Sequence, residues 1–117
     1  MKVKDLVKML DLASVKMDTT IADIHELINF AIESDARYVC FNSANIPYAK
    51  KYLDEKGRND LVLIGTAGFP TGCFPTETKI QEIKMCAEWG CKEIDICSNQ
   101  GFLKSDMYEA VSYTHLR

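Results

Sequence analysis

An aspartate in an apolar strand is the residue whose position first suggests chemistry. Asp95 lies between two isoleucines in KEIDIC, residues 92–97, which otherwise has the composition of a buried β-strand. An unpaired buried carboxylate is costly, so that of Asp95 must be paired, hydrogen-bonded or kept neutral. Glu93 points to the same side of the strand, and Asp95 is nearer the C-terminal end, where catalytic groups collect in parallel α/β folds. A catalytic carboxylate and a structural one with satisfied hydrogen bonds both fit this pattern.

Three loops that follow apolar runs contain further polar residues. They are CFNSANIP (residues 40–47), GTAGFPTGCFPTET (residues 65–78) and DICSNQGFLKS (residues 95–105). Residues 68–72, GFPTG, could bind a phosphate through backbone N–H groups, but they lack the spacing of a P-loop or of a dinucleotide-binding motif. We therefore interpret residues 68–72, and likewise SNQG at residues 98–101, as turns.

An alternation of strand and helix patterns positions these loops. Short runs rich in β-branched and apolar residues predict strands at residues 10–15, 37–41, 60–65 and 92–97. Helical periodicity predicts a short amphipathic opening at residues 6–10, helices over residues 19–32, 43–57 and 76–90, and the start of another at residues 104–111. Strands that are apolar on both faces and alternate with helices predict a parallel sheet with helices packed against it.

Capping signals mark the ends of these helices. Thr20, followed three residues later by Asp23, predicts a capping box at the start of the first long helix. Asn45 is a candidate N-cap of the second, and Gly57 and Gly90 suit the left-handed residue that ends a helix. Each of the three long predicted helices, over residues 19–32, 43–57 and 76–90, therefore has a defined start or stop in the sequence.

The composition describes one globular domain and excludes several classes of function. The chain has 117 residues, of which 47% are hydrophobic and 26% charged, and its net charge is −3. Since no basic patch is visible, we expect no nucleic-acid partner. No apolar run approaches the roughly 20 residues that a membrane helix requires, so we expect no membrane association. The opening MKVKDLVKML lacks the apolar stretch of a signal peptide.

The cysteines argue for a reduced protein without a metal site. Cys40, Cys73, Cys86, Cys91 and Cys97 are an odd number and contain no C-x-x-C spacing. Free thiols in apolar runs behave as small hydrophobic residues, and this pattern predicts a cytoplasmic location. The two histidines stand apart from each other, so no zinc site is expected.

Three longer segments carry a family resemblance. They are YVCFNSANIPYAKKYL (residues 38–53), IGTAGFPTGCFPTETKIQEIK (residues 64–84) and GCKEIDICSNQGFLKSDMYEAV (residues 90–111). In order and spacing they resemble the deoxyribose-phosphate aldolases, most specifically in G-F-P-x-G followed by T-E-x-K, and in G-x-x-E-I-D followed by G-x-L-K-S. The family fold is an α/β (β/α)8 TIM barrel. The resemblance therefore implies that residues 1–111 are the N-terminal half of such a barrel, with about the first four βα units.

The resemblance also implies an activity. The family cleaves 2-deoxy-D-ribose 5-phosphate reversibly to acetaldehyde and D-glyceraldehyde 3-phosphate, in the breakdown of deoxyribonucleotides and carbohydrates. A lysine forms a Schiff base with the substrate carbonyl and the protonated imine accepts electrons, so no metal or organic cofactor is expected. The family's proton-relay aspartate falls on Asp95. Its carboxylate is then expected to face the barrel interior, where a lysine and an ordered water meet it.

Three further residues are implied to line the substrate pocket. Asp11 matches an aspartate that opens the family's first strand, although the usual D-x-T pattern is Asp11-Leu12-Ala13 here and lacks the hydroxyl. Cys40 falls on a pocket-facing strand position and is expected to line the pocket, because no histidine or cation near it in sequence would make it a nucleophile. Phe69, in the G-F-P turn, would line the pocket floor.

The chain contains only half of what such a barrel needs, since a whole one takes roughly 200–250 residues. The Schiff-base lysine is expected to be absent, because Lys104 belongs to the L-K-S motif and no other lysine matches the catalytic one. Residues 112–117, SYTHLR, depart from the family and are interpreted as foreign sequence, with a natural terminus as the alternative. Half a barrel leaves two edge strands unpaired and one sheet face uncovered, so we expect self-association and no activity from this chain alone.

Other functions remain open on the sequence alone. A receiver-like, doubly wound signalling module has about this length, but it requires an acidic pair after the first strand, where only Asp11 is present. A different Schiff-base or phosphate-handling barrel enzyme is a second alternative, and a non-catalytic fragment that only self-associates is a third. For an enzyme of either kind, the expected partner is a small phosphorylated sugar or aldehyde.

Overall fold

A computed structural model describes residues 2–107, which form a parallel four-stranded sheet with helices between the strands. In chain order the elements are α1 (Val3–Met9), β1 (Asp11–Ser14), α2 (Ile21–Ser34), β2 (Tyr38–Phe41), the 3-10 helix η1 (Ser43–Asn45), α3 (Ile46–Glu55), β3 (Val62–Ala67), α4 (Thr76–Glu88), β4 (Glu93–Ile96) and α5 (Gln100–Lys104). The predicted alternation of strands and helices is confirmed. The segment interpreted as foreign, residues 112–117, lies outside the described residues.

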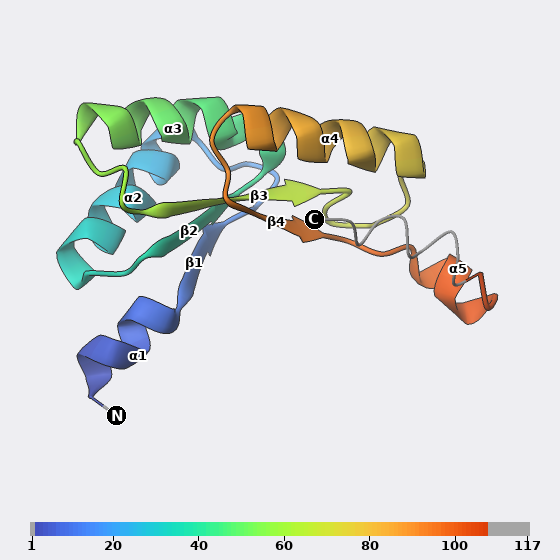
Figure 1. The fold of residues 1–117 in the computed structure, drawn as a ribbon, viewed down its shortest axis with the longest axis horizontal. Coiled ribbons are helices and arrows are strands. Elements are labelled where there is room, and N and C mark those ends of the chain that lie inside the picture. The colour runs from blue at the N-terminus through green and yellow to red at the C-terminus, as the bar shows by residue number, and fades with distance from the viewer. Residues whose placement is uncertain (1, 108–117) are drawn as a thin grey trace.

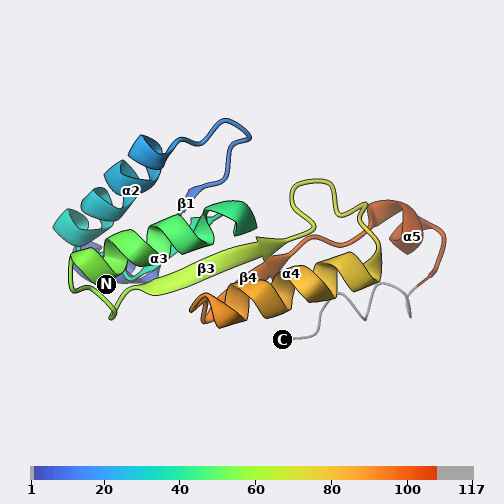
Figure 2. The ribbon, with the colours of Figure 1, turned by 90° about the horizontal axis from the view of Figure 1, so that it is seen from above.

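The strands pair in the order β1-β2-β3-β4, and each neighbouring pair is parallel. Right-handed crossovers between strands that are added in sequence always return on the same side of the sheet, so the connecting helices share one face. Figure 1 and Figure 2 show α2, α3 and α4 on that face. This is the arrangement of consecutive βα units in a barrel, because a doubly wound sheet would reverse its strand order.

One hydrophobic core fills the space between the helices and the sheet. The two central strands contribute Val39, Phe41 and Leu63, each at most 2% exposed. The helices contribute a further set of buried side chains, namely Ile24, Ile28, Ala31, Ile46, Ala49, Leu53 and Cys86. Because side chains alternate along a strand, residues between the core positions, such as Cys40 and Ile64, point to the opposite face of the sheet.

The edge strands are more exposed than the sequence predicted. The central strands β2 and β3 are buried along most of their length, whereas β1 and β4 alternate between exposed and half-buried residues. The prediction of strands apolar on both faces is therefore wrong for β1 and β4. Within residues 2–107 each of these two strands has a neighbour on one side only, as expected for half a barrel. β3 starts at residue 62, two residues later than predicted. Leu61 still belongs to the preceding turn, in which its N–H donates a hydrogen bond to the Arg58 carbonyl at 3.3 Å.

Three of the four predicted helix ends are confirmed and one is wrong. Thr20 Oγ1 accepts from the Asp23 N–H at 3.1 Å and Asp23 Oδ2 accepts from the Thr20 N–H at 2.9 Å, which is the predicted capping box. Gly57 after α3 and Gly90 after α4 both have the predicted left-handed backbone, with φ +66° and +103°. Asn45 does not cap α3 with its side chain, because it ends η1 with helical backbone angles and a capping side chain needs an extended backbone.

The segment after β4 differs from the prediction. Residues 98–101 were expected to form a turn and a helix was expected to begin at Lys104. The structure instead has α5 at Gln100–Lys104, and Asn99 caps it by accepting a hydrogen bond from the Phe102 N–H at 3.0 Å. No helix among residues 2–107 is long and apolar enough to cross a membrane.

The capping box can be tested by a single substitution. Thr20→Ala removes the acceptor for the Asp23 N–H and is expected to lower the free energy of unfolding by about 0.5–2 kcal/mol. Urea unfolding followed by circular dichroism measures this change. Thr78→Ala, at an exposed position inside α4, serves as the matched control, and we expect it to change stability by about 0.5 kcal/mol or less. Equal losses in both variants would contradict a stabilising role of the cap.

Candidate active site

β4 presents two carboxylates on one side of its backbone. Glu93 and Asp95 are exposed, whereas Ile94 between them packs against the core on the helix-covered face. The Cys40 thiol on β2 donates a weak hydrogen bond to Oδ2 of Asp95 at 3.7 Å. Asp95 therefore does not lie in a buried strand, as its sequence neighbours suggested. Its carboxylate lies on the face of the sheet opposite the connecting helices.

The contact between Cys40 and Asp95 shows that this face is concave. β2 and β4 both pair with β3, so the contact spans an intervening strand. Neighbouring strands are about 4.8 Å apart, and two short side chains on alternate strands of a flat sheet would not meet. They meet because the sheet curves towards this face. Contact between alternate strands is the packing that fills the interior of a (β/α)8 barrel.

A third carboxylate, that of Asp11 at the start of β1, belongs to the same group. Burial raises the pKa of the Asp11 carboxyl, and the negative charges of Asp95 and Glu93 raise it further. Within residues 2–107, no lysine or arginine forms an ion pair with any of these three carboxylates. The concave face therefore concentrates negative charge, which would stabilise the protonated form of any lysine placed against it.

Cys40 is held as a neutral thiol on this face. Burial raises its pKa to about 12, with additional contributions from the charges of Asp95 and Asp11 and from the hydrogen bond to Asp95. The thiolate is the nucleophilic form of cysteine, and it is scarce at neutral pH in this setting. The environment of Cys40 thus favours a lining role over a nucleophilic one.

Glu82 on α4 joins two of the loops that follow strands. Its Oε2 accepts a hydrogen bond from the Ser43 hydroxyl at 2.5 Å, after β2, and its Oε1 accepts one from the Gly68 N–H at 3.0 Å, after β3. The Ser43 N–H in turn donates to Thr66 Oγ1 at 3.2 Å. Glu82 could not be singled out from the sequence, because a glutamate on an amphipathic helix is ordinarily solvated and its partners here are 39 and 14 residues away.

Residues 68–72 form the predicted tight turn, in which the Gly72 N–H donates to the Gly68 carbonyl at 2.7 Å. A Cβ at Gly68 would lie 2.8 Å from Cε of Lys79, whose side chain is packed there at 1% exposure. A Cβ at Gly72 would overlap the backbone carbonyl of Ser98. The two glycines therefore let this loop pack against both α4 and the loop after β4. The burial of Lys79, like the contacts of the half-buried Glu82, could not be predicted from the sequence pattern.

The predicted site residues separate into two groups. Asp11, Cys40 and Asp95 come together on the concave face, through the contacts described above. Phe69 lies in the tight turn beyond the C-terminal end of β3, is partly exposed and precedes a cis peptide bond to Pro70. In the part of the chain that the structure describes, no group of three or more His, Cys, Asp or Glu residues could hold a metal ion.

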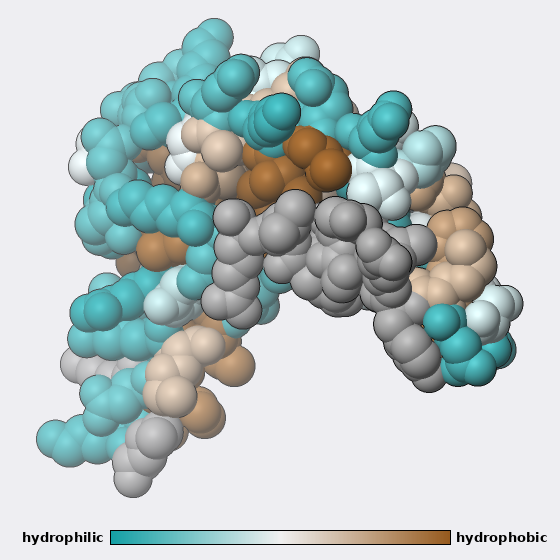
Figure 3. Space-filling model, turned by 45° about the vertical axis from the view of Figure 1, so that its right-hand side comes forward, coloured by the Kyte–Doolittle hydropathy of each residue, from teal (hydrophilic) through white to brown (hydrophobic). Residues whose placement is uncertain are grey.

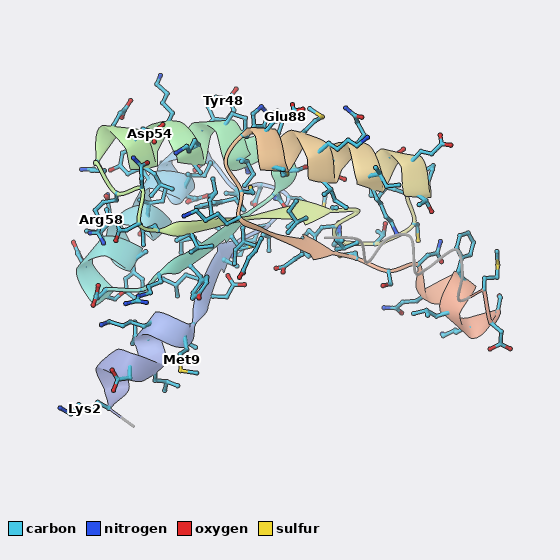
Figure 4. All side chains as sticks on the ribbon, viewed as in Figure 1. Lys2, Met9, Tyr48, Asp54, Arg58 and Glu88 are labelled. Atoms are coloured by element: carbon cyan, nitrogen blue, oxygen red, sulfur yellow. The ribbon has the colours of Figure 1, made fainter. Side chains whose placement is uncertain are left out.

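The link made by Glu82 leads to a stability prediction. Glu82→Ala leaves the buried Gly68 N–H without its acceptor and is expected to cost about 1–3 kcal/mol of unfolding free energy. Glu88→Ala is the matched control, because Glu88 lies on the same helix and points away from the sheet (Figure 4). The control should change stability by about 0.5 kcal/mol or less in urea unfolding. A loss in Glu82→Ala no larger than that of the control would show that Glu82 does not hold the loops.

The contact between Asp95 and Cys40 leads to a prediction about thiol reactivity. Asp95→Asn removes a negative charge beside Cys40 and is expected to lower the pKa of the thiol, while burial keeps it above its ordinary value. Alkylation by iodoacetamide across a pH series, resolved by peptide mass spectrometry, should therefore be faster at Cys40 in the variant. The exposed Cys73 is the internal reference and should react at an unchanged rate. An unchanged Cys40 profile would refute the electrostatic coupling.

Comparison with known proteins identifies sequences that are similar to this chain. No family model matches it. The deoxyribose-phosphate aldolase of Thermococcus kodakarensis is 37% identical over 111 residues, which are 95% of this chain and 49% of the relative. Deoxyribose-phosphate aldolase 1 of Mesoplasma florum is 40% identical over 104 residues, 89% of this chain and 46% of the relative. The chain spans about half the length of the curated relatives it matches.

Solved structures agree with this relationship. The aldolase QR15 has a TM-score of 0.82 at 26% identity, covering 92% of this chain and 46% of that one. The deoxyribose phosphate aldolase of Aeropyrum pernix, described as tetrameric, has a TM-score of 0.76 at 21% identity, covering 95% of this chain and 50% of that one. The expected fold class, four βα units of a (β/α)8 barrel, is confirmed. In sequence and in fold, this chain is a relative of the deoxyribose-phosphate aldolases, of which it spans about half.

Proposed function

We propose that this chain is part of a deoxyribose-phosphate aldolase and supplies the proton-relay carboxylate, Asp95. The reaction is the reversible cleavage of 2-deoxy-D-ribose 5-phosphate to acetaldehyde and D-glyceraldehyde 3-phosphate. A lysine from the rest of the full-length protein forms the imine with the substrate carbonyl, and Asp95 moves protons through a water beside it. Neither a metal nor an organic cofactor takes part in this proposal.

The observation that supports this role is the placement of Asp95 on the concave face of the sheet. The carboxylates of Asp11 and Glu93 lie close enough to act on one another there, and residues 2–107 supply no ion-pair partner to them. Such a face is suited to lysines that arrive from other strands, since each cation would offset carboxylate repulsion. In the same proposal Asp11, Cys40 and Phe69 line the substrate pocket.

The receiver-like alternative conflicts with the topology. Receiver-type sheets have the order 2-1-3-4-5, with helices on both faces. The order here is sequential, and α2, α3 and α4 lie together on one face. Among residues 2–107 no specific contact favours another Schiff-base or phosphate-handling barrel enzyme.

Two further properties belong to the proposal. The chain alone is inactive, because it supplies no imine-forming lysine, and it self-associates through the edges of β1 and β4, each of which has one strand neighbour among residues 2–107. A single monomeric species in sedimentation velocity at micromolar concentration would contradict self-association. The cytoplasmic location expected from the cysteines completes the proposal.

The function can be tested with a chimaera in which this chain replaces the matching half of the Thermococcus kodakarensis relative. We expect retro-aldol turnover and borohydride-trapped imine from the chimaera, and neither from this chain alone. Asp95→Asn in the chimaera should lower kcat by about 10²–10⁴-fold while the imine still forms. Glu88→Gln, far from the concave face, is the control that should leave kcat unchanged.

Two outcomes would overturn the proposal. Turnover by the chain alone would show that the chemistry does not depend on an external lysine. An Asp95→Asn chimaera with the turnover of its parent would show that this carboxylate does not relay protons.

A further inference from the structure

The C-terminal end of α4 has a backbone geometry that brings two cysteines together. The Cys91 N–H donates to the Cys86 carbonyl at 3.0 Å, the Gly90 N–H donates to the Ala87 carbonyl at 3.1 Å, and Gly90 has φ +103°. These two hydrogen bonds define a Schellman motif, in which the residue after the left-handed position contacts the third residue from the helix end. That contact is usually between two hydrophobic side chains. Here both are cysteines.

Gly65 on β3 provides the space that both sulfur atoms occupy. A Cβ at Gly65 would lie 2.8 Å from Sγ of Cys86 and 3.1 Å from Sγ of Cys91. Both sulfurs therefore lie against the same bare stretch of backbone and next to each other. Any larger residue at position 65 would push them out of this position, so the strand, the helix end and the turn together define a site for two thiols.

One of the two thiols can be reached from outside. Cys86 is fully buried, whereas Cys91 is partly exposed and lines a pocket of about 580 Å³ with Ile83 and Ile94. Figure 3 shows hydrophobic surface on this side, below the polar outer surface of the helices. The hydrogen bond from the Cys91 thiol to the Cys86 sulfur lowers the pKa of Cys86 and raises that of Cys91. A small reagent can thus meet Cys91 with a second sulfur immediately behind it.

We propose that Cys86 and Cys91 form a redox-active dithiol, which a small peroxide converts to an intramolecular disulfide. The backbone between them is already closed by the Schellman hydrogen bonds, so the disulfide requires little movement of the chain. The bond would tie the end of α4 to the residue that leads into β4. The inference does not depend on the proposed aldolase role.

The chemistry is balanced by one equivalent of hydrogen peroxide. One sulfur of the pair, in its thiolate form, attacks one oxygen of the peroxide, the O–O bond breaks, and that sulfur becomes a sulfenic acid while the first water leaves. The other sulfur of the pair then attacks the oxidised sulfur, the S–O bond breaks and the second water leaves. The two sulfurs lose two electrons and two protons in total, and the peroxide takes up both.

Two of the other three cysteines lie elsewhere in the fold. Cys40 lies on the concave face beside Asp95, and Cys73 is exposed in the loop after β3. Gly65 and the paired thiols lie on the helix-covered face of the sheet, as the position of Cys86 in the core shows. Oxidation is therefore expected to be selective for the pair and to leave the carboxylates of the concave face in place.

The test is limited oxidation of the fully reduced chain by hydrogen peroxide, followed by alkylation, trypsin digestion and mass spectrometry. Both cysteines fall in one tryptic peptide, MCAEWGCK (residues 85–92), because Lys84 and Lys92 are cleavage sites. We expect this peptide to lose the mass of two hydrogens and to escape alkylation at both sulfurs. This product should form before Cys40 or Cys73 is modified, and urea should abolish the preference.

Variants separate the pair from ordinary thiol oxidation. Cys91→Ser and Cys86→Ala should each prevent the two-hydrogen loss, whereas Cys73→Ser, in the exposed loop, should leave it unchanged. Stepwise oxygen addition at Cys91 in the wild-type chain, without any bond to Cys86, would overturn the proposal. A disulfide that formed equally well in urea would also overturn the proposal, since its formation would not depend on the folded structure.

A second measurement needs no oxidation. A trivalent arsenical such as phenylarsine oxide bridges two adjacent thiols and binds a single thiol weakly. The reduced wild-type chain and Cys73→Ser should each retain one equivalent on residues 85–92, and both single variants of the pair should lose it. Absence of the bridged peptide in the wild-type chain would show that the sulfurs do not lie side by side, and the proposal would be wrong.

Discussion

Sequential pairing of parallel strands is the constraint on which the rest of this structure depends. Each crossover is right-handed, so adding strands in the order β1-β2-β3-β4 returns every connecting helix to the same face. The main hydrophobic core forms on that face. The other face is left for side chains that alternate with the core residues, and the curvature of the sheet turns these side chains towards one another.

That division explains how three carboxylates are tolerated in strands with apolar neighbours. Glu93 and Asp95 are exposed in this chain, so water solvates them and no internal cation is required. The same groups would become costly if further strands covered the face, because buried like charges must be offset by cations or protonated. The raised pKa of Asp11 shows the beginning of this effect with only part of the face covered. The chemistry of the face therefore depends on what closes it.

Sequence patterns predicted the regular elements well and their local exceptions poorly. The capping box at Thr20 could be predicted because its two partners are three residues apart. The end of α3 could be predicted because glycine is the residue that most readily adopts the left-handed backbone found at Gly57. Asn45 was misassigned because the preceding 3-10 turn changed its backbone angles, and α5 was misplaced because Asn99 was taken for part of a turn. The edge strands were predicted too apolar, since sequence alone does not tell a central strand from an edge strand.

The sequence by itself determined the α/β alternation, the tight turn at residues 68–72 and the acidic residue in the last strand. Only the tertiary structure decided which side chains meet: Cys40 with Asp95, Glu82 with Ser43 and Gly68, and Gly65 with both Cys86 and Cys91. The physical reason is the distance along the chain over which each effect acts. Periodicity and capping act within a few residues along the chain, whereas the curvature of the sheet and the packing of α4 on it bring together residues that are tens of positions apart.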